Sequence, residues 1–131
     1  MLTSCENTAH NREHKSIIIA HLNVRSLNKH YTDICALLHL KNIDVLCLSE
    51  TFLDSEKTIP NPIGYSFYHK DRTKHGGGVA IMVKNIFKVT ELQISDSSSS
   101  NSSVEAISIK LQHNFEKQIL VSCIYRPPKY G

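Results

Sequence analysis

The sequence lacks tryptophan, and it has only four prolines and five glycines among its 131 residues. It also lacks any apolar run near the roughly 20 residues that a membrane-spanning helix requires. The first fifteen residues, MLTSCENTAHNREHK, have none of the apolar core of a secretion signal. We therefore expect neither secretion nor a membrane location, and we expect residues 1–15 to form a disordered polar leader.

Cysteine is also scarce, and its spacing excludes a paired metal or redox motif. The four cysteines are Cys5, Cys35, Cys47 and Cys123, and no two of them form a C-x-x-C pair. Cys47 and Cys123 lie inside apolar segments, where free thiols are usually buried. The pattern predicts reduced, buried thiols in an intracellular protein.

Charge of one sign is not dominant either. The formal net charge of +3 permits a polyanionic partner without requiring one. With 40% hydrophobic and 21% charged residues, the composition is that of an ordinary soluble chain, and 131 residues suffice for one domain at most.

The first part of the chain alternates between strand and helix patterns. SIIIAHL at 16–22 is a short β-branched segment that predicts a buried strand, and 43–49 (IDVLCLS) predicts another. Between them, residues 28–42 place apolar side chains at helical spacing, at Tyr31, Ile34, Cys35 and Leu38. Strand, helix and strand in this order predict a βαβ unit with two parallel strands.

After residue 51 the pattern changes to strands and turns. We predict strands at 65–69, 78–84, 89–95, 104–111 and 117–126, the third of them at an exposed edge, and a low-complexity loop at 95–103. The class is therefore α/β, with one βαβ unit followed by antiparallel strands. We expect the first half of a two-sheet α/β sandwich, in which one mixed sheet has a helix packed on it.

Two polar residues follow the two predicted parallel strands. Asn23 ends the first strand, and Glu50 follows the apolar run VLCLS of the second. Ligands of open α/β sheets collect outside the carboxyl ends of the strands, so the topology brings one amide and one carboxylate together at that edge. A single carboxylate can begin a Mg²⁺ site, although a surface glutamate is the plainer alternative.

Four motifs carry a resemblance to a known family. They are AHLNVRSL, DVLCLSETFL, KDRTKHGGGVAIMVK and ILVSCIYRPP, and they occur in this order over residues 16–131. The chain resembles the start of the endonuclease/exonuclease/phosphatase superfamily, in the branch found in non-LTR retrotransposons, and it is similar in pattern to exonuclease III-like apurinic endonucleases. The GGGVA and YRPP stretches are similar to the endonucleases of non-LTR (LINE-type) retrotransposons.

The resemblance implies roles for individual residues. Glu50 would be the carboxylate ligand of Mg²⁺ or Mn²⁺, Asn23 would help to orient the site, and Tyr125 would lie near the scissile phosphate. Arg126 stands where repair enzymes have an apolar residue, and its chemistry suits a phosphate contact. The implied reaction is the hydrolytic nicking of DNA.

The family's second half is not found in this sequence. No Asp-x-Asn and no Ser-Asp-His occurs, so the residues that would supply a general base are missing. We interpret 16–131 as the N-terminal half of an endonuclease domain that ends after the YRPP motif, inactive alone. We also expect the apolar face of its sheet to be uncovered unless the missing half or another chain covers it.

Other features have plainer interpretations. HNREH matches a zinc-protease pattern with His10, Glu13 and His14, but it lies in the polar leader, where a solvated tail is the stronger interpretation. Arg72 and Lys74 in the basic run KDRTKH could contact DNA phosphates or simply be solvated. The glycines at 76–78 predict a flexible strand entry instead of a phosphate-binding loop.

The functional expectation has alternatives from other classes. The first is a Mg²⁺-dependent DNA endonuclease of a retroelement, which would act in the nucleus. A non-catalytic nucleic-acid-binding or dimerising fragment is the second, and a phosphatase-like hydrolase of phosphoesters is the third. For Glu105, which opens a strand, we expect only an exposed carboxylate.

Overall fold

The computed structural model describes residues 16–54, 56, 58–71, 77–93, 104–113 and 117–128. The predicted leader at 1–15 and the predicted loop at 95–103 therefore contribute no described residue. The described part forms one helix and seven strands in the order β1 (Ile19–Asn23), α2 (Leu27–Leu40), β2 (Val45–Ser49), β3 (Tyr65–Lys70), β4 (Val79–Lys84), β5 (Lys88–Leu92), β6 (Glu105–Gln112) and β7 (Gln118–Tyr125).

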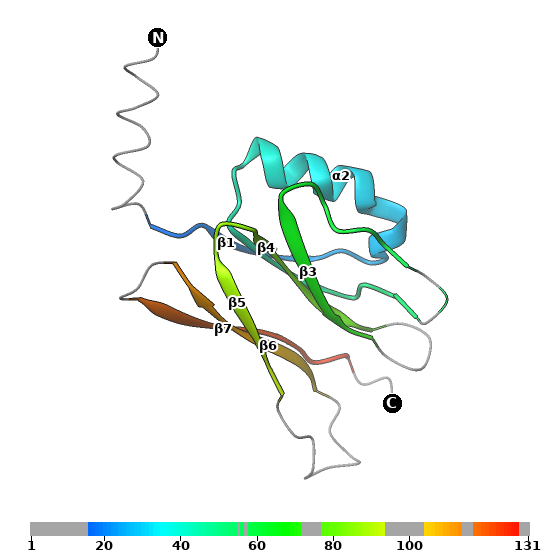
Figure 1. Cartoon of the computed structure of the whole chain (residues 1–131). Helices are drawn as coiled ribbons and strands as arrows, with labels where there is room; N and C mark the ends of the chain where they lie inside the picture. The colour runs from blue at the N-terminus through cyan, green and yellow to red at the C-terminus, as the bar shows by residue number, and fades with distance from the viewer. Residues whose placement is uncertain are drawn as a thin grey trace.

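These elements form two sheets and a helical layer (Figure 1). The first sheet has the strand order β1-β2-β4-β3, and the second has the order β5-β6-β7. Strands β1 and β2 are parallel, with Asn23 beside Ser49, and every other described pair is antiparallel. The α/β class, the βαβ unit and the mixed first sheet are confirmed.

Helix α2 covers one face of the first sheet. Its N-cap is Ser26, whose hydroxyl accepts a hydrogen bond from the Lys29 backbone N–H at 3.3 Å, as serine commonly does at this position. Leu27, Ile34 and Leu38 are buried on its inner side. They pack against apolar side chains of β2 and β4, so the helix fixes the layer that carries β2.

The second sheet covers the other face of the first, so the predicted two-sheet sandwich class is confirmed, and the expectation that this chain leaves the apolar face of its first sheet uncovered is wrong. Strands β5 to β7 supply that cover from within this chain. The core between the sheets consists of buried residues from both: Val45, Cys47, Val79, Ile81, Val83, Phe87, Ile107, Ile109, Leu111, Val121 and Cys123. Strand β2 is consequently buried on both faces.

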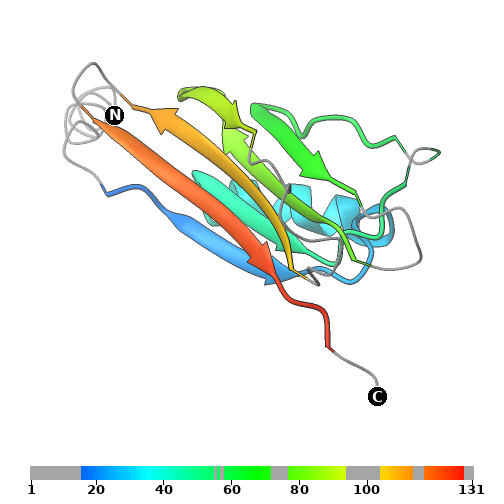
Figure 2. The ribbon, with the colours of Figure 1, turned by 90° about the horizontal axis from the view of Figure 1, so that it is seen from below.

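Strands β1 and β7 are the two edge strands on one flank of the molecule (Figure 2). The predicted buried character of the first strand is wrong, because an edge strand has a neighbour on one side only. Ile19 in β1 is 48% exposed, and Leu120 and Ile124 in β7 are 65% and 63% exposed. This flank therefore carries apolar side chains that nothing in the described part covers.

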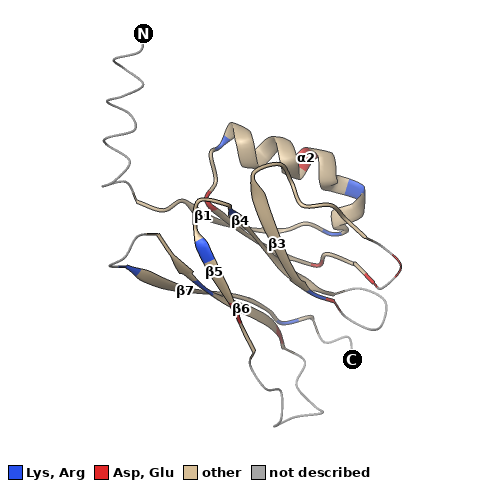
Figure 3. Ribbon diagram, in the orientation of Figure 1, with Lys and Arg blue, Asp and Glu red and all other residues tan. Residues whose placement is uncertain are grey.

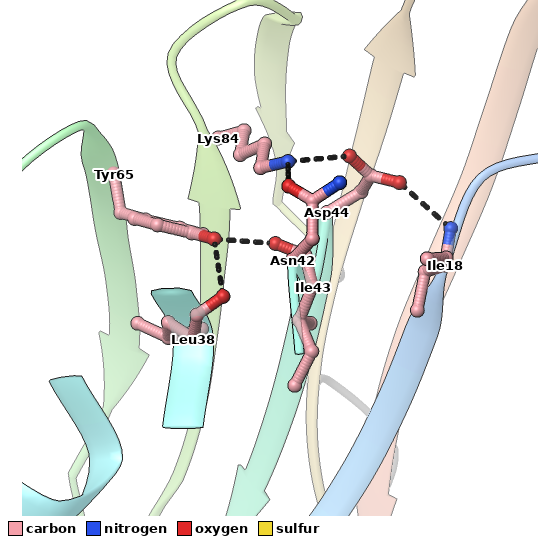
Figure 4. Close-up of polar contacts among 7 residues, drawn as sticks. All are labelled: Ile18, Leu38, Asn42, Ile43, Asp44, Tyr65 and Lys84. Atoms are coloured by element: carbon pink, nitrogen blue, oxygen red, sulfur yellow. Dashed lines mark hydrogen bonds and ion pairs between the residues drawn. The ribbon is translucent and has the colours of Figure 1, made fainter. Parts of the chain in front are cut away.

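A polar network lies where β2 begins (Figure 4). Asp44 forms an ion pair with Lys84 at 3.3 Å and accepts a hydrogen bond from the Ile18 backbone N–H at 2.8 Å. Lys84 also donates to the side chain of Asn42. The Tyr65 hydroxyl donates to the Ile43 carbonyl at 2.5 Å, so this network ties β1, β2, β3 and β4 together.

Basic and acidic residues are spread over the helix and both sheets in the described part of the chain (Figure 3). They do not gather there into a single basic face. No helix within the described residues is long and apolar enough to cross a membrane.

Candidate active site

Glu50 lies at the carboxyl end of β2, directly after the buried Ser49. The parallel pairing of β1 and β2 puts Asn23, the last residue of β1, beside Ser49. The Asn23 side-chain amide donates a hydrogen bond from Nδ2 to Glu50 Oε2 at 2.5 Å. The predicted convergence of these two residues at one sheet edge is therefore confirmed.

The second sheet supplies another hydrogen bond to the same oxygen. Tyr125 is the last residue of β7, and its hydroxyl donates to Glu50 Oε2 at 2.6 Å. Asn23 ends β1, Glu50 directly follows β2 and Tyr125 ends β7 of the other sheet, so the three meet at one carboxylate. Two donors on one oxygen fix the orientation of that carboxylate and leave Oε1 without a hydrogen bond to any described residue.

This arrangement keeps Glu50 ionised. The hydrogen bonds from Tyr125 and from Asn23 lower the pKa of the Glu50 carboxyl below its usual range, and Arg25 lowers it further through its charge. Burial acts in the opposite direction without overcoming them. In the described part of the chain, no lysine or arginine forms an ion pair with Glu50, so its charge is stabilised mainly by neutral donors.

The backbone at Glu50 adopts an unusual conformation. Its φ of 55° lies in the left-handed region, which an L-residue occupies only when its surroundings fix it. The Glu50 carbonyl accepts from the Ser26 N–H at 2.9 Å, and the Thr51 carbonyl accepts from the Leu27 N–H at 2.9 Å. The segment that caps helix α2 therefore holds one side of this turn.

A glycine pair holds the other side. Thr51 N–H donates to the Gly78 carbonyl at 3.3 Å, and Phe52 N–H donates to the Gly77 carbonyl at 2.9 Å. Gly78 has a φ of 96°, and the place that a Cβ would take there is filled by Thr51 Oγ1. Both glycines are buried in this defined conformation, in contrast to the flexible strand entry that the sequence suggested.

The second sheet also reaches this glycine pair. The Gly78 N–H lies 3.1 Å from Glu105 Oε1 and 3.3 Å from Oε2, and it donates to this carboxylate. The expectation that Glu105 is merely exposed is wrong, because the carboxylate turns toward the first sheet and is partly buried. A single glutamate at the start of a strand gives no signal of this contact in the sequence.

The residues present fit one hard cation. Mg²⁺ is commonly held by one or two carboxylates together with water and phosphate oxygens, and an ionised Glu50 with Oε1 uncommitted meets that requirement. The described residues contain no cluster of three or more His, Cys, Asp or Glu side chains that could hold a metal alone. A cation held by Glu50 would therefore take its remaining ligands from water or phosphate oxygens.

The other predicted site residues are less well defined. Arg126 is exposed and follows Tyr125 directly, at the same end of the sheets as Glu50. Arg72 and Lys74 lie outside the described residues, as do the residues of the HNREH motif. The structure thus brings Asn23, Glu50 and Tyr125 together, and their catalytic roles stay a prediction.

Comparisons with known proteins agree with this architecture. The sequence profile of the Endonuclease/Exonuclease/phosphatase family matches residues 20–108. No curated protein sequence matches the chain.

Solved structures similar to the chain share its fold. A Neisseria 3′ phosphatase bound to a product DNA hairpin aligns with a TM-score of 0.57 and 22% identity, over 80% of this chain and 40% of that one. An AP endonuclease from Archaeoglobus fulgidus aligns with a TM-score of 0.56 and 23% identity, over 75% and 38% of the two chains. For an AP endonuclease from Leishmania major the TM-score is 0.56 and the identity 20%, over 83% and 39%. The chain therefore spans about two-fifths of the length of these relatives.

Proposed function

This chain belongs to the endonuclease/exonuclease/phosphatase family, and we propose that it forms the metal-holding part of a phosphodiester hydrolase that acts on DNA. The observation that supports the proposal most directly is the Glu50 carboxylate, which Asn23 and Tyr125 orient through hydrogen bonds of 2.5 and 2.6 Å. An oriented, ionised carboxylate at the carboxyl ends of parallel strands is suited to a cation that binds phosphate.

The roles of the three residues follow from their contacts. Glu50 would hold Mg²⁺ or Mn²⁺ through the oxygen that the two donors leave uncommitted. Asn23 and Tyr125 keep the carboxylate ionised and prevent it from rotating. The bound metal would neutralise charge that develops on a phosphate. Arg126, exposed beside Tyr125, would contact a neighbouring phosphate of the same strand.

DNA is the proposed substrate, and a retroelement nuclease is the proposed context. The solved structure of the Neisseria relative contains a product DNA hairpin, which supports DNA over a small phosphoester. The GGGVA and YRPP stretches support the retrotransposon branch and, with it, action in the nucleus. Since no Asp-x-Asn or Ser-Asp-His occurs among these 131 residues, we propose that cleavage needs a general base from elsewhere.

Metal binding provides the first test. The 131-residue chain is titrated with Mn²⁺ and followed by electron paramagnetic resonance, alongside Glu50→Ala and the control Glu91→Ala, which removes an exposed carboxylate from β5. We expect Glu50→Ala to weaken binding at least tenfold and Glu91→Ala to leave it unchanged. Equal affinity of the wild type and Glu50→Ala would overturn the proposal.

Nicking of supercoiled plasmid in the presence of Mg²⁺ provides the second test. We expect no nicking above background from the chain alone, because the Asp-x-Asn and Ser-Asp-His motifs that would supply the family's general base do not occur in it. Nicking that disappears in Glu50→Ala would support the hydrolase and overturn the need for an additional base. Nicking that Glu50→Ala retains would not depend on Glu50, and would count against Glu50 as the metal ligand of a hydrolase.

A second candidate function is supported by the flank formed by β1 and β7. In the described part of the chain both strands are sheet edges and expose Ile19, Leu120 and Ile124, so there the flank offers edge backbone and apolar side chains to another protein segment. A non-catalytic fragment that pairs through this flank would sediment as a dimer. Alternatively it would bind DNA with an affinity that Glu50→Ala leaves unchanged. A monomer whose DNA binding requires Glu50 would contradict it.

A further inference from the structure

Glu105 makes an unexpected contact between the two sheets. It is the first residue of β6, yet its carboxylate accepts a hydrogen bond from the Gly78 N–H of the other sheet, with N–O distances of 3.1 and 3.3 Å. Gly78 is buried, so its N–H needs a partner within the protein. Because Gly78 directly precedes β4, the contact lies at the same end of the sheets as Glu50.

Backbone hydrogen bonds link Gly78 to the residues that follow Glu50, the candidate metal ligand. The Gly78 and Gly77 carbonyls accept from the N–H groups of Thr51 and Phe52, the two residues after Glu50. Glu50 itself has a φ of 55°, a conformation that relaxes unless its neighbours hold it. Two of the backbone hydrogen bonds that hold this turn therefore go to the glycine pair that Glu105 fixes.

The register of the second sheet places Glu105 next to another site residue. Glu105 in β6 is paired directly with Tyr125 in β7, so both side chains lie on the same face of the sheet. Tyr125 donates to Glu50 Oε2, while Glu105 accepts from Gly78. This cross-strand pair thus acts on the Glu50 turn in two ways. Tyr125 contacts the Glu50 side chain, and Glu105 holds Gly78, whose carbonyl is hydrogen-bonded to the backbone of the turn.

We propose that Glu105 is a positioning residue, which fixes the orientation of Glu50 by holding Gly78 and, through it, the Thr51–Phe52 backbone. The proposal rests on the proposed function, in which Glu50 holds the metal. Glu105 does not touch the metal in this scheme. Its effect on metal affinity passes through the backbone of the turn.

The first experiment measures Mn²⁺ affinity by electron paramagnetic resonance on the 131-residue chain. Glu105→Ala removes the acceptor, whereas Glu105→Gln keeps a carbonyl oxygen within reach of the Gly78 N–H. We expect Glu105→Ala to weaken Mn²⁺ binding about fivefold and Glu105→Gln to restore most of it. The control is Glu91→Ala, an exposed carboxylate of the same sheet, which should leave the affinity unchanged. Wild-type affinity in Glu105→Ala would overturn the proposal.

The second experiment measures amide hydrogen exchange by nuclear magnetic resonance without metal, so it does not depend on the proposed function. In Glu105→Ala we expect exchange at Gly78 and Thr51 to accelerate by about tenfold, with little change in the central residues of β2 and β6. Unchanged exchange at Gly78 and Thr51, or equal acceleration throughout both sheets, would overturn the positioning role.

The two experiments separate failure of the metal site from failure of the positioning role. If the wild type binds no Mn²⁺ through Glu50, the proposed function fails. Local acceleration at Gly78 and Thr51 in Glu105→Ala would still show that Glu105 holds the turn. If Glu50 binds Mn²⁺ and Glu105→Ala changes neither affinity nor exchange, the proposed function stands and the positioning role fails.

Discussion

Strand β2 begins directly after Asp44 and ends directly before Glu50, so the surroundings of a carboxylate can be compared at the two ends of one buried strand. Asp44 forms an ion pair with Lys84 at 3.3 Å and accepts from the Ile18 N–H. Glu50 instead accepts from two neutral groups, the Asn23 amide and the Tyr125 hydroxyl. Lys84 forms an ion pair with the first charge, whereas the second has no ion-pair partner among the described residues and is stabilised mainly by neutral donors, with a smaller effect of the Arg25 charge.

The difference indicates what each end of the strand does. At the Asp44 end the polar groups satisfy one another and tie four strands together, as Figure 4 shows. At the Glu50 end, an ionised oxygen remains without a partner among the described residues, and the backbone is held in a left-handed conformation. An ionised carboxylate without an ion-pair partner among the described residues, at a strained backbone position, is typical of a binding site.

The largest effect in this comparison is expected from Gly78→Ala at the Glu50 end. The new Cβ would overlap Thr51 Oγ1, and the residue would also carry a φ of 96°. We expect the free energy of unfolding to fall by about 3 kcal/mol. Urea denaturation followed by circular dichroism measures it.

Gly64→Ala is the matched control for this substitution. Gly64 has a similar φ of 84°, but a Cβ there would meet no atom within 4 Å. We expect a loss of only about 1 kcal/mol, the cost of the backbone conformation alone. Equal losses at the two positions would show that the close approach of Gly78 to Thr51 contributes nothing.

A smaller effect is expected from the same carboxylate-to-amide change at both ends of β2. Asp44→Asn would leave Lys84 without its ion-pair partner, and we expect a loss of about 1–2 kcal/mol in the free energy of unfolding. Glu50→Gln keeps an acceptor for both neutral donors, so we expect a change of less than about 1 kcal/mol.

The metal affinity of these two variants should change in the opposite order. Asp44→Asn should keep the Mn²⁺ affinity of the wild type, whereas Glu50→Gln should lose it. Denaturation and Mn²⁺ titration of the same two samples measure both quantities. A Glu50→Gln variant that is strongly destabilised, or that keeps its metal, would remove the distinction between the two ends.

The sequence was sufficient to predict the Asn23–Glu50 half of the site. Short apolar strands on either side of a helical repeat imply a parallel pair, and parallel strands bring their carboxyl ends to one edge. Local patterns determine that arrangement, so the convergence of residues 23 and 50 required no knowledge of the second sheet. The position of the helix could be predicted for the same reason.

The contacts between the sheets could not be predicted in this way. The approach of Glu105 to Gly78 depends on how β6 packs across β4, which no local period in the sequence encodes. The edge position of β1 likewise depends on strand order, and its apolar composition alone suggested burial. Tyr125 was assigned from the resemblance to a family, because an isolated tyrosine at a strand end carries no chemical signal.

The smallest effect is expected from Tyr125→Phe, which removes one neutral donor from Glu50. Because the hydrogen bond from Tyr125 is the largest cause of the lowered pKa of Glu50, we expect that pKa to rise toward its ordinary value of 4.5. A carboxyl whose pKa is lower in the folded state contributes stability above its unfolded pKa, and this contribution is lost as pH falls through the folded pKa. Tyr125→Phe should therefore lower stability by at most about 1 kcal/mol at pH 7 and by less below pH 4.

Tyr68→Phe is the control, since the Tyr68 hydroxyl forms no hydrogen bond with any other described residue and the side chain is half-buried. Titration of the Glu50 side-chain carbon signal by nuclear magnetic resonance, with urea denaturation at pH 7 and pH 4, measures both quantities. If the pKa of Glu50 were equally low in Tyr125→Phe and in the wild type, the second sheet would not stabilise the Glu50 charge. The site would then depend on the first sheet alone, and Asn23 would be its only orienting donor among the described residues.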